Sequence, residues 1–264
     1  MDYVNALFAE LWRDYTRRLC PSAAKVHALL QEGQPLLNDH IALRTFNLPK
    51  VGLDRLAAPF IALGYEPKGE YDFEAKKLYA QHFEHPNSEA PKVFISELQI
   101  GRCSTGLQQK VRALVDQVDD DALRGSDFLS GGRLWDLDFA TFQALAEESE
   151  YAGWVAAHGY GANHFTVSVN QLSSLDSVKG VNDVLRSAGF AINEFGGEVK
   201  GSPEVLLEQS STMADKVPVM FSDGEQTIPG GFYEFAKRYL MEDGNLYPGF
   251  VAASADKIFE STNR

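Results

Sequence analysis

The chain has 264 residues, a formal net charge of -13, 44% hydrophobic residues and 23% charged residues. This ordinary globular balance is enough to bury a core, and it excludes a long disordered arm. The acidic surface repels nucleic acid and anionic membranes, so neither is expected as a partner. A small anionic substrate remains compatible with this charge if a cation receives it inside a pocket.

The N-terminal segment and the cysteines indicate the compartment. Residues 1–19 mix acidic, basic and apolar residues at helical spacing, unlike the basic start and apolar centre of a signal peptide. No run of about 18 apolar residues occurs, so no membrane span is expected. Cys20 and Cys103 are the only cysteines and form no CxxC motif. These features predict the reducing cytoplasm and exclude a thiolate metal site.

The first half of the chain changes from helices to strands. Helical periodicity predicts helices over 2–19 and 23–32. The alternating segment HIALRTF, which begins at His40, predicts a strand. The next segment, GLDRLAAPFIALGY, predicts a helix that ends at its last glycine despite an internal proline. Two shorter strands are predicted at 77–83 and 93–100.

The second half begins after a helical stretch. Residues 105–158 contain TGLQQKVRALVDQVD and FATFQALAEESEYAGWVAAHG, both helical by spacing, with a loop at the glycine pair 131–132. GANHFTVSVN then predicts a strand with His164 near its start, and SVKGVNDVLRSAGF predicts a helix that ends at Gly189. A last strand, FYEFAKR, contains Glu234.

The second half repeats the order of the first. His40 and His164 lie at nearly the same distance before the glycine that ends the following helix. Further along, Glu97 follows His40 and Glu234 follows His164, with a somewhat longer separation in the second half. Each half therefore offers a histidine at the start of its first strand and a glutamate in its last strand, which is typical of a duplicated unit.

These four residues are candidate metal ligands. Two imidazoles and one carboxylate can form a facial triad on iron(II), which leaves positions open for substrate and dioxygen. With Glu97 as a fourth ligand, a glyoxalase-like site for Zn, Ni or Mn is the alternative. Either histidine could instead be a packed core residue. Glu234 lies in a segment too apolar for a bare carboxylate, so it needs a metal, a cation or another partner.

Arg44 is the candidate cation for an anionic substrate. It lies four residues after His40, so on a strand it shares the face of His40 at about 13 Å along the strand. Its guanidinium can bind a carboxylate through two hydrogen bonds, and a structural salt bridge is the alternative. Helix faces, a helix end or an exposed turn suffice to explain the remaining histidines, namely His27, His82, His85 and His158.

Four motifs resemble those of the 2-oxoadipate dioxygenase/decarboxylase family. They are DHIALRTF, GANHFTVSVN, LEQSSTMAD and PGGFYEFAKRY, and the resemblance extends from about Ala24 to Phe250. It implies an α+β fold related to hydroxymandelate synthase. In this fold two vicinal-oxygen-chelate-like strand-helix-strand modules form a curved central sheet, with additional helices at the N-terminus and between the modules.

This fold divides the chain into segments of one functional unit, residues 1–264. The N-terminal helices would occupy 1–36, the first module 37–104, the helical connector 105–160 and the second module 161–264. Longer family members have an extended C-terminal region that helps to shape the substrate pocket. This chain ends at Arg264, soon after the last candidate ligand Glu234, so the metal site is expected to be retained while the substrate can differ.

The resemblance also assigns roles to residues. It implies that His40, His164 and Glu234 bind iron(II) and that Arg44 contacts the substrate carboxylate. It places Glu97 beside the ligands or in a structural role. A family motif further places three residues near the pocket, where a loop stabilised by side-chain hydrogen bonds is their alternative interpretation; they are Gln209, Ser210 and Ser211.

The implied reaction uses a small 2-oxo dicarboxylic acid and dioxygen as partners. Oxidative decarboxylation and hydroxylation of the shortened acid would convert 2-oxoadipate into 2-hydroxyglutarate and carbon dioxide, without a separate co-substrate. Two other functions remain compatible with the residues: a glyoxalase-like metal-dependent isomerase or lyase, and a metal-free module that binds a small acid.

Overall fold

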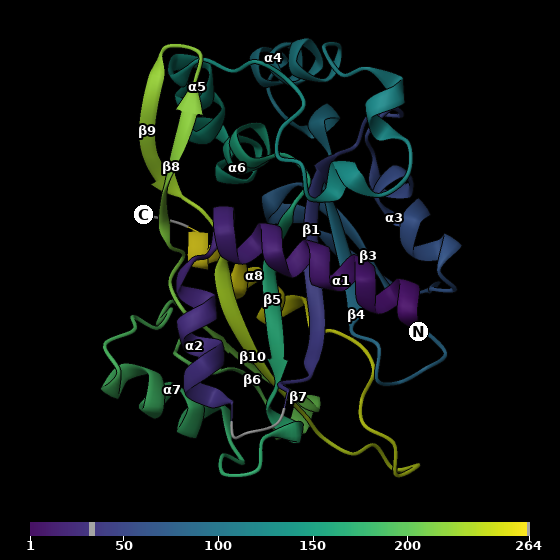
Figure 1. Cartoon of the computed structure of the whole chain (residues 1–264), viewed down its shortest axis with the longest axis vertical. Coiled ribbons are helices and arrows are strands. Elements are labelled where there is room, and N and C mark those ends of the chain that lie inside the picture. The colour runs from purple at the N-terminus through teal and green to yellow at the C-terminus, as the bar shows by residue number, and fades with distance from the viewer. Residues whose placement is uncertain (32–34, 263–264) are drawn as a thin grey trace.

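One eight-stranded sheet forms the centre of the molecule, with the strand order β2-β3-β4-β1-β5-β10-β7-β6 (Figure 1). The computed structural model describes residues 1–31 and 35–262. The sheet curls into a half-barrel. The first half of the chain supplies four strands: β1 Asn38–Phe46, β2 Glu66–Phe73, β3 Leu78–Glu84 and β4 Lys92–Leu98. The second half supplies β5 Ala162–Ser168, β6 Lys200–Ser202, β7 Leu207–Ser211 and β10 Phe232–Arg238.

The two halves of the sheet meet where β1 and β5 pair antiparallel. On one side β4 lies parallel to β1, and on the other side β10 lies parallel to β5. Parallel neighbours need a crossover connection, which includes α3 (Leu53–Ala62) in the first half and α7 (Val178–Ser187) in the second. This arrangement confirms the predicted α+β fold class.

Further helices lie at both ends of the chain and between the halves. The N-terminal ones are α1 Asp2–Asp14, the π-helix η1 Tyr15–Leu19 and α2 Ser22–Leu30. Between the halves are α4 Thr105–Val115, α5 Phe139–Glu148 and α6 Glu150–His158. The second half also contains the hairpin β8 Lys216–Phe221 and β9 Gly224–Pro229, followed by α8 Ala252–Ile258 and the 3-10 helix η8 Phe259–Thr262. None of the described helices is long and apolar enough to cross a membrane.

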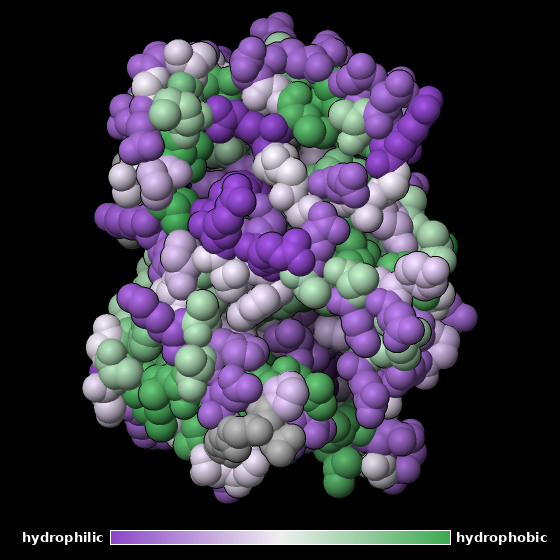
Figure 2. All heavy atoms as spheres, in the orientation of Figure 1, coloured by the Kyte–Doolittle hydropathy of each residue, from purple (hydrophilic) through white to green (hydrophobic). Residues whose placement is uncertain are grey.

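The two faces of the sheet have different partners. The N-terminal helix α1 crosses β1 and β5 on one face (Figure 1), where Trp12 and Tyr15 contact the ring of Phe165. Side chains alternate along a strand, so His164 points to the opposite face. On that inner face α8 packs against β2, β6 and β7. The outer surface seen in Figure 2 is mostly hydrophilic, with hydrophobic residues in scattered groups.

Most of the predicted strands and helices are confirmed, and the differences have physical reasons. The segment 139–158 forms two helices because Ser149 adopts an extended backbone, φ -148° and ψ 108°, and its hydroxyl accepts the N–H of Ala152 as the N-cap of α6. The helix predicted over 23–32 ends at Leu30, and its predicted last residue, Glu32, lies outside the described residues.

Several strands were not predicted. The edge strand β2 has the sequence EPKGEYDF, and only Phe73 is buried, so it lacks the alternating apolar residues that indicate a strand. The motif segment at Gln209 is the strand β7, although a loop was the alternative expectation. The strand predicted at 77–83 is β3, but the expected surface role of His82, which it contains, is wrong because this side chain is only 3% exposed.

Candidate metal centre

Three neighbouring strands carry the three predicted ligands. His40 is the third residue of β1, His164 the third of β5 and Glu234 the third of β10. In the sheet register Ala42 lies opposite His164, and Glu234 lies opposite Thr166. The three side chains therefore share the inner face, and their ligand atoms all lie within 4.8 Å of one another.

The ring nitrogens of the two histidines have distinct roles. Nδ1 of His40 lies 2.7 Å from Oδ1 of Asp39, and Nδ1 of His164 lies 3.1 Å from Oδ1 of Asn163. With Nδ1 donating, Nε2 keeps a lone pair. These Nε2 atoms lie 3.5 Å and 3.2 Å from the two carboxylate oxygens of Glu234. Three electron-pair donors thus converge on one point, which is the arrangement that a cation requires.

The burial of these groups fits a bound metal. Burial raises the pKa of Glu234, and it lowers the pKa of His164 well below its usual value. Oε2 of Glu234 is buried and has no hydrogen-bond partner among the described residues, a costly state for a carboxylate. Two nitrogens and one oxygen suit Zn, Fe, Ni or Mn. A divalent ion would therefore satisfy Oε2 of Glu234, which the described residues leave unpaired.

Glycines position the strand that carries Glu234. The backbone N–H of Gly231 donates to the carbonyl of Leu19 at 2.6 Å, next to the hydrogen bond from the Tyr15 hydroxyl to the carbonyl of Phe232. A Cβ atom at Gly230 would lie 2.2 Å from the carbonyl oxygen of Leu19. The glycine pair of the motif PGGFYEF therefore permits the close approach of the N-terminal π-helix.

The three motif residues of β7 have different environments. Nε2 of Gln209 donates to Oε1 of Glu234 at 2.6 Å, which fixes one carboxylate oxygen. Ser211 lies opposite Glu234 in the register and exchanges a hydrogen bond with Ser261 of η8. Ser210 points to the other face and donates to Asn182 of α7. The structure thus brings Gln209 and Ser211 to the inner face and leaves Ser210 outside it.

The structure places Glu97 away from the three ligands. It lies opposite Thr45 in the pairing of β1 with β4, five residues beyond His40, whereas Glu234 lies opposite Thr166, two residues beyond His164. The two offsets, five and two residues, differ by an odd number, so the side chain of Glu97 points to the face opposite the three candidate ligands. There its carboxylate accepts the N–H of Leu53 at 2.9 Å, at the start of α3, a favourable place for a negative charge.

Arg44 lies on the same face as His40 and is only 1% exposed. Its guanidinium is within 5.5 Å of the ring centres of Tyr151, Trp154 and Phe259. Nη1 lies 3.5 Å from Glu150, but neither Nη1 nor Nε has a hydrogen-bond partner among the described residues. A buried cation with spare donors suits a ligand carboxylate.

A cavity of about 210 Å³ lies beside this guanidinium. Three residues that contact Arg44 also line the cavity, namely Glu150, Tyr151 and Phe259. Lys76 and Lys77 also line it. The cavity is therefore a candidate route from the surface to Arg44.

Sequence reasoning missed the groups that surround the ligands. The ring of Phe250 lies 4.8 Å from His40, and the ring of Phe232 lies 4.6 Å from His164, so aromatic walls exclude water from the site. Arg238 forms an ion pair with Asp39. Burial raises the pKa of Asp39, but Arg238 and the hydrogen bond with His40 hold it well below its usual range. Arg238, the basic residue that ends the motif FYEFAKR, was the signal in the sequence that could have indicated this ion pair.

Comparisons with known proteins identify the family of the chain. A model of the 2-oxoadipate dioxygenase/decarboxylase family matches residues 8–247. The chain is 37% identical to the Arabidopsis thaliana protein "2-oxoadipate dioxygenase/decarboxylase, chloroplastic", over 88% of this chain and 69% of that protein.

Solved structures extend the likeness to three dimensions. A crystal structure from Shewanella frigidimarina NCIMB 400, described as a proposed hydrolase, shares 60% identity and a TM-score of 0.91, covering 95% of this chain and 98% of that one. A hydroxyglutarate synthase of Oryza sativa, solved in complex with 2-oxoadipate, shares 33% identity and a TM-score of 0.90, covering 97% and 91%. A glyoxalase-superfamily protein of Ralstonia eutropha JMP134, at 23% identity, a TM-score of 0.77 and coverage of 95% and 86%, has the same fold. The chain belongs to the 2-oxoadipate dioxygenase/decarboxylase family.

Proposed function

We propose that this chain is an iron(II)-dependent dioxygenase that decarboxylates a small 2-oxo dicarboxylic acid, with 2-oxoadipate as the first substrate to test. The observation that carries the proposal is the buried convergence of His40, His164 and Glu234. It is supported by Arg44 further along the same strand face. The relatives named for action on 2-oxoadipate supply the substrate class.

The three ligands would hold iron(II) from one side. Bound iron would supply open positions at which a 2-oxo acid and dioxygen meet. Gln209 keeps one oxygen of Glu234 engaged through its 2.6 Å hydrogen bond, so the carboxylate orientation is fixed before metal binds. Phe232 and Phe250 line the ligands with apolar rings and keep bulk water from the reacting atoms.

Arg44 would bind the distal carboxylate of the substrate. His40 and Arg44 share one strand face, so a linear diacid can direct its 2-oxo end to the metal and its other end to the guanidinium. Nε and Nη1 have no hydrogen-bond partner among the described residues, and Nη2 has only a 3.4 Å contact with Thr262. A carboxylate can therefore bind one edge of the guanidinium, through Nη2 together with either Nε or Nη1. Glu150, at 3.5 Å from Nη1, would compete with the substrate for this cation.

The balanced reaction consumes one dioxygen for each substrate. One carboxyl group of 2-oxoadipate leaves as carbon dioxide, and 2-hydroxyglutarate retains the other five carbons. Both atoms of dioxygen enter the products. The protein's contribution is to hold the substrate at both ends, to exclude water and to keep the ligand side chains in place.

Two other functions compete with this proposal. A glyoxalase-like isomerase or lyase would use Zn, Ni or Mn and a fourth ligand, but Glu97 hydrogen-bonds to α3 instead. A metal-free module would bind a small acid through Arg44 alone. The unpaired Oε2 of Glu234 favours a metal-dependent function over that module.

Anaerobic reconstitution with iron(II) tests the proposal. We expect 2-oxoadipate to cause dioxygen uptake, with a product mass that corresponds to 2-hydroxyglutarate and one carbon dioxide per dioxygen consumed. Turnover of a 2-oxo acid without dioxygen uptake would overturn the proposal in favour of the isomerase or lyase.

A pair of glutamate variants separates the ligand sets. Glu234→Gln removes one of three ligands and should abolish stoichiometric iron binding. Glu97→Gln should bind iron like the parent protein, because its carboxylate contacts the start of α3. Equal loss of iron in both variants would support the four-ligand site instead, and retained substrate affinity without any metal would support the binding module.

A further inference from the structure

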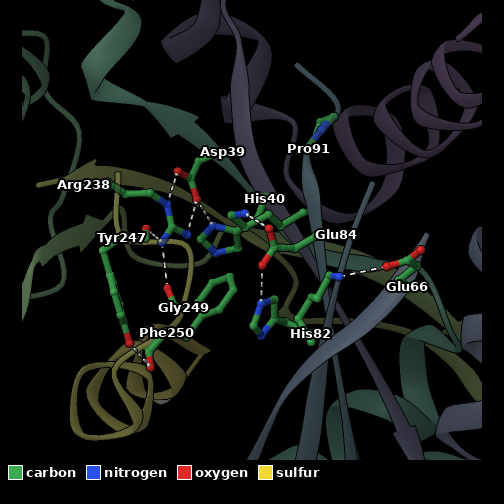
Figure 3. Close-up of polar contacts among 12 residues, drawn as sticks. Asp39, His40, Glu66, His82, Glu84, Pro91, Arg238, Tyr247, Gly249 and Phe250 are labelled. Atoms are coloured by element: carbon green, nitrogen blue, oxygen red, sulfur yellow. Dashed lines mark hydrogen bonds and ion pairs between the residues drawn. The ribbon is translucent and has the colours of Figure 1, made fainter. Parts of the chain in front are cut away.

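A buried carboxylate contacts one metal ligand from behind. Asp39 precedes His40 in β1, and its Oδ1 lies 2.7 Å from Nδ1 of the imidazole (Figure 3). Arg238, from β10, binds both oxygens of Asp39: Nε lies 2.7 Å from Oδ2 and Nη2 lies 2.8 Å from Oδ1. Asp39 is therefore held by two charge-assisted hydrogen bonds from a planar guanidinium and points its Oδ1 at His40.

The same guanidinium holds a segment that covers the ligand. Nη1 of Arg238 donates to the carbonyls of Tyr247 and Gly249 at 2.8 Å and 2.7 Å (Figure 3). The guanidinium also lies 5.2 Å from the ring centre of Phe250, which itself contacts the ring of His40. Arg238 thus contacts both Asp39, which hydrogen-bonds to His40, and Phe250, which packs against the ring of His40.

The other histidine ligand has a weaker support. Nδ1 of His164 lies 3.1 Å from the neutral amide oxygen of Asn163, in the position that corresponds to Asp39. An ionised carboxylate accepts only, so it admits one imidazole tautomer, whereas an amide can accept through oxygen or donate through nitrogen. Asp39 therefore restricts His40 to one tautomer, whereas Asn163 restricts the tautomer of His164 less.

Fold stability alone is a weak reason for this ion pair. Arg238 is 5% exposed, and the Asp39 side chain is 6% exposed. Burying two charges costs several kcal/mol each, and well-packed apolar residues are often as stable as a buried pair. The pair is electrically neutral as a unit, so it adds little net charge to the site. The specific contacts of the pair are the one that orients His40 and those that hold the segment with Tyr247 and Gly249.

We propose that Asp39 is a positioning residue that holds His40 as the Nδ1–H tautomer, and that Arg238 fixes Asp39 and holds Phe250 against the ring. The Nε2 lone pair of His40, which the Thr166 hydroxyl contacts at 3.1 Å, then lies on the side of Glu234 and is available to the metal. The inference rests on the proposed metal centre. Partners of this kind typically change metal affinity by about 10–100-fold when removed. We expect substitution of Asp39 to lower the metal affinity by this factor, and substitution of Asn163 to lower it less.

The first experiment examines the ring in the metal-free protein. With histidines labelled with nitrogen-15, the ring nitrogens of His40 should report a single Nδ1–H tautomer in the parent protein. In Asp39→Asn the amide can donate or accept, so we expect the Nε2–H tautomer to become populated. A merely structural role of Asp39 would leave the tautomer unchanged, and that result would overturn the inference.

The second experiment measures metal affinity by titration with cobalt(II) and, anaerobically, with iron(II). Asp39→Asn should bind about 10–100-fold more weakly. The matched control is Glu84→Gln, which removes a similar carboxylate-histidine contact, 2.9 Å from Glu84 to His82 (Figure 3). His82 is outside the ligand cluster, so the control should bind like the parent protein. Parent-like affinity in Asp39→Asn would overturn the inference.

A second variant is available if Asp39→Asn does not fold. Asp39→Asn leaves Arg238 as a buried unpaired charge, which is strongly destabilising. If that variant is unfolded, Asp39→Asn combined with Arg238→Met removes both charges and replaces it in both experiments, with the same expected results. If the parent protein binds no metal, the proposed function fails, while the tautomer experiment still decides the inference.

Discussion

The two halves of the sheet share an order of strands but differ at equivalent positions. His40 and His164 are both third residues of the first strand in their half. Glu234 lies opposite the residue two after His164, and the corresponding position in the first half, opposite Ala42, holds Phe94. The first half therefore supplies one candidate ligand and an aromatic ring, and the second half supplies two candidate ligands.

The first half also has charged residues at positions where the second half has neutral ones. Four residues after His40 is Arg44, whereas four residues after His164 is Ser168. Asp39 supports His40 with a carboxylate, and Asn163 supports His164 with an amide. The two halves therefore share a common frame but carry different polar groups: in the proposed function both halves supply metal ligands, and only the first half supplies the cation for the substrate.

Phe94→Glu tests the equivalence of the two positions and has the largest expected effect. It removes a buried ring and buries a carboxylate, so the metal-free protein should lose about 3–5 kcal/mol of unfolding free energy. A divalent metal should restore part of this loss, because the new carboxylate occupies the position equivalent to Glu234. Urea unfolding with and without metal measures both. Phe94→Gln is the control, and recovery by metal that is equal in both variants would refute the equivalence.

Arg44→Lys tests the division of roles. A lysine keeps the charge but loses the planar pair of donors. Hydrogen bonds to charged groups contribute about 1.5–3 kcal/mol, so KM for a 2-oxo dicarboxylic acid should rise about 10–100-fold, with little change in iron content. Steady-state kinetics measures this. Glu150→Gln removes the competing carboxylate and should change KM in the opposite direction; a rise in KM there would contradict the assigned role of Arg44.

His158 provides a contrast with the candidate ligand His164, since it is a buried histidine outside the cluster. Burial lowers its pKa to about 3, and its Nε2 lies 2.8 Å from the carbonyl of Pro229. The unfolded chain binds a proton below its ordinary pKa of 6.5, whereas the folded protein does so only near 3. Unfolding free energy should therefore fall by up to about 1.4 kcal/mol per pH unit as pH decreases through this range.

The measurement is urea unfolding of metal-free protein between pH 7 and 4, compared with His158→Gln. The variant should lose this contribution and show a shallower dependence on pH. An unchanged dependence would mean that other groups carry the acid sensitivity.

Glu97→Gln has the smallest expected effect. Its charge interacts with the start of α3 through the N–H of Leu53, an interaction of about 0.3–1 kcal/mol. Thermal unfolding should show a loss of that size at an unchanged metal stoichiometry. A loss of stability that appears only in the metal-loaded protein would contradict the structural role of Glu97.

Much of the frame could be predicted from the sequence. Alternating apolar residues around His40 and His164 indicate strands, and the helices between them have clear periodicity. The three candidate ligands were singled out because their residue types recur within a repeated order, and because the motifs around them resemble those of a family. These are local signals, and the structure places the three residues together.

The failures concern register and contacts between distant segments. The repeated order of histidine and glutamate suggested that Glu97 and Glu234 are equivalent, but an offset of an odd number of residues turns a side chain to the other face. Arg238 and Phe250 were missed because Asp39 and His40, which they contact, lie in a strand far away in the sequence. Edge strand β2 has too few apolar residues to show a pattern.

The docking of the N-terminal π-helix against the glycine pair affects the order in which the molecule assembles. The hydrogen bond between Tyr15 and Phe232 joins residues 217 positions apart. During synthesis this contact can form only after the residues between them have been made. Contacts of such large sequence separation form slowly, because a long loop must close first. The strand that carries Glu234 is one partner in this contact, so we expect the capacity to bind metal to be among the last properties that the folding chain acquires.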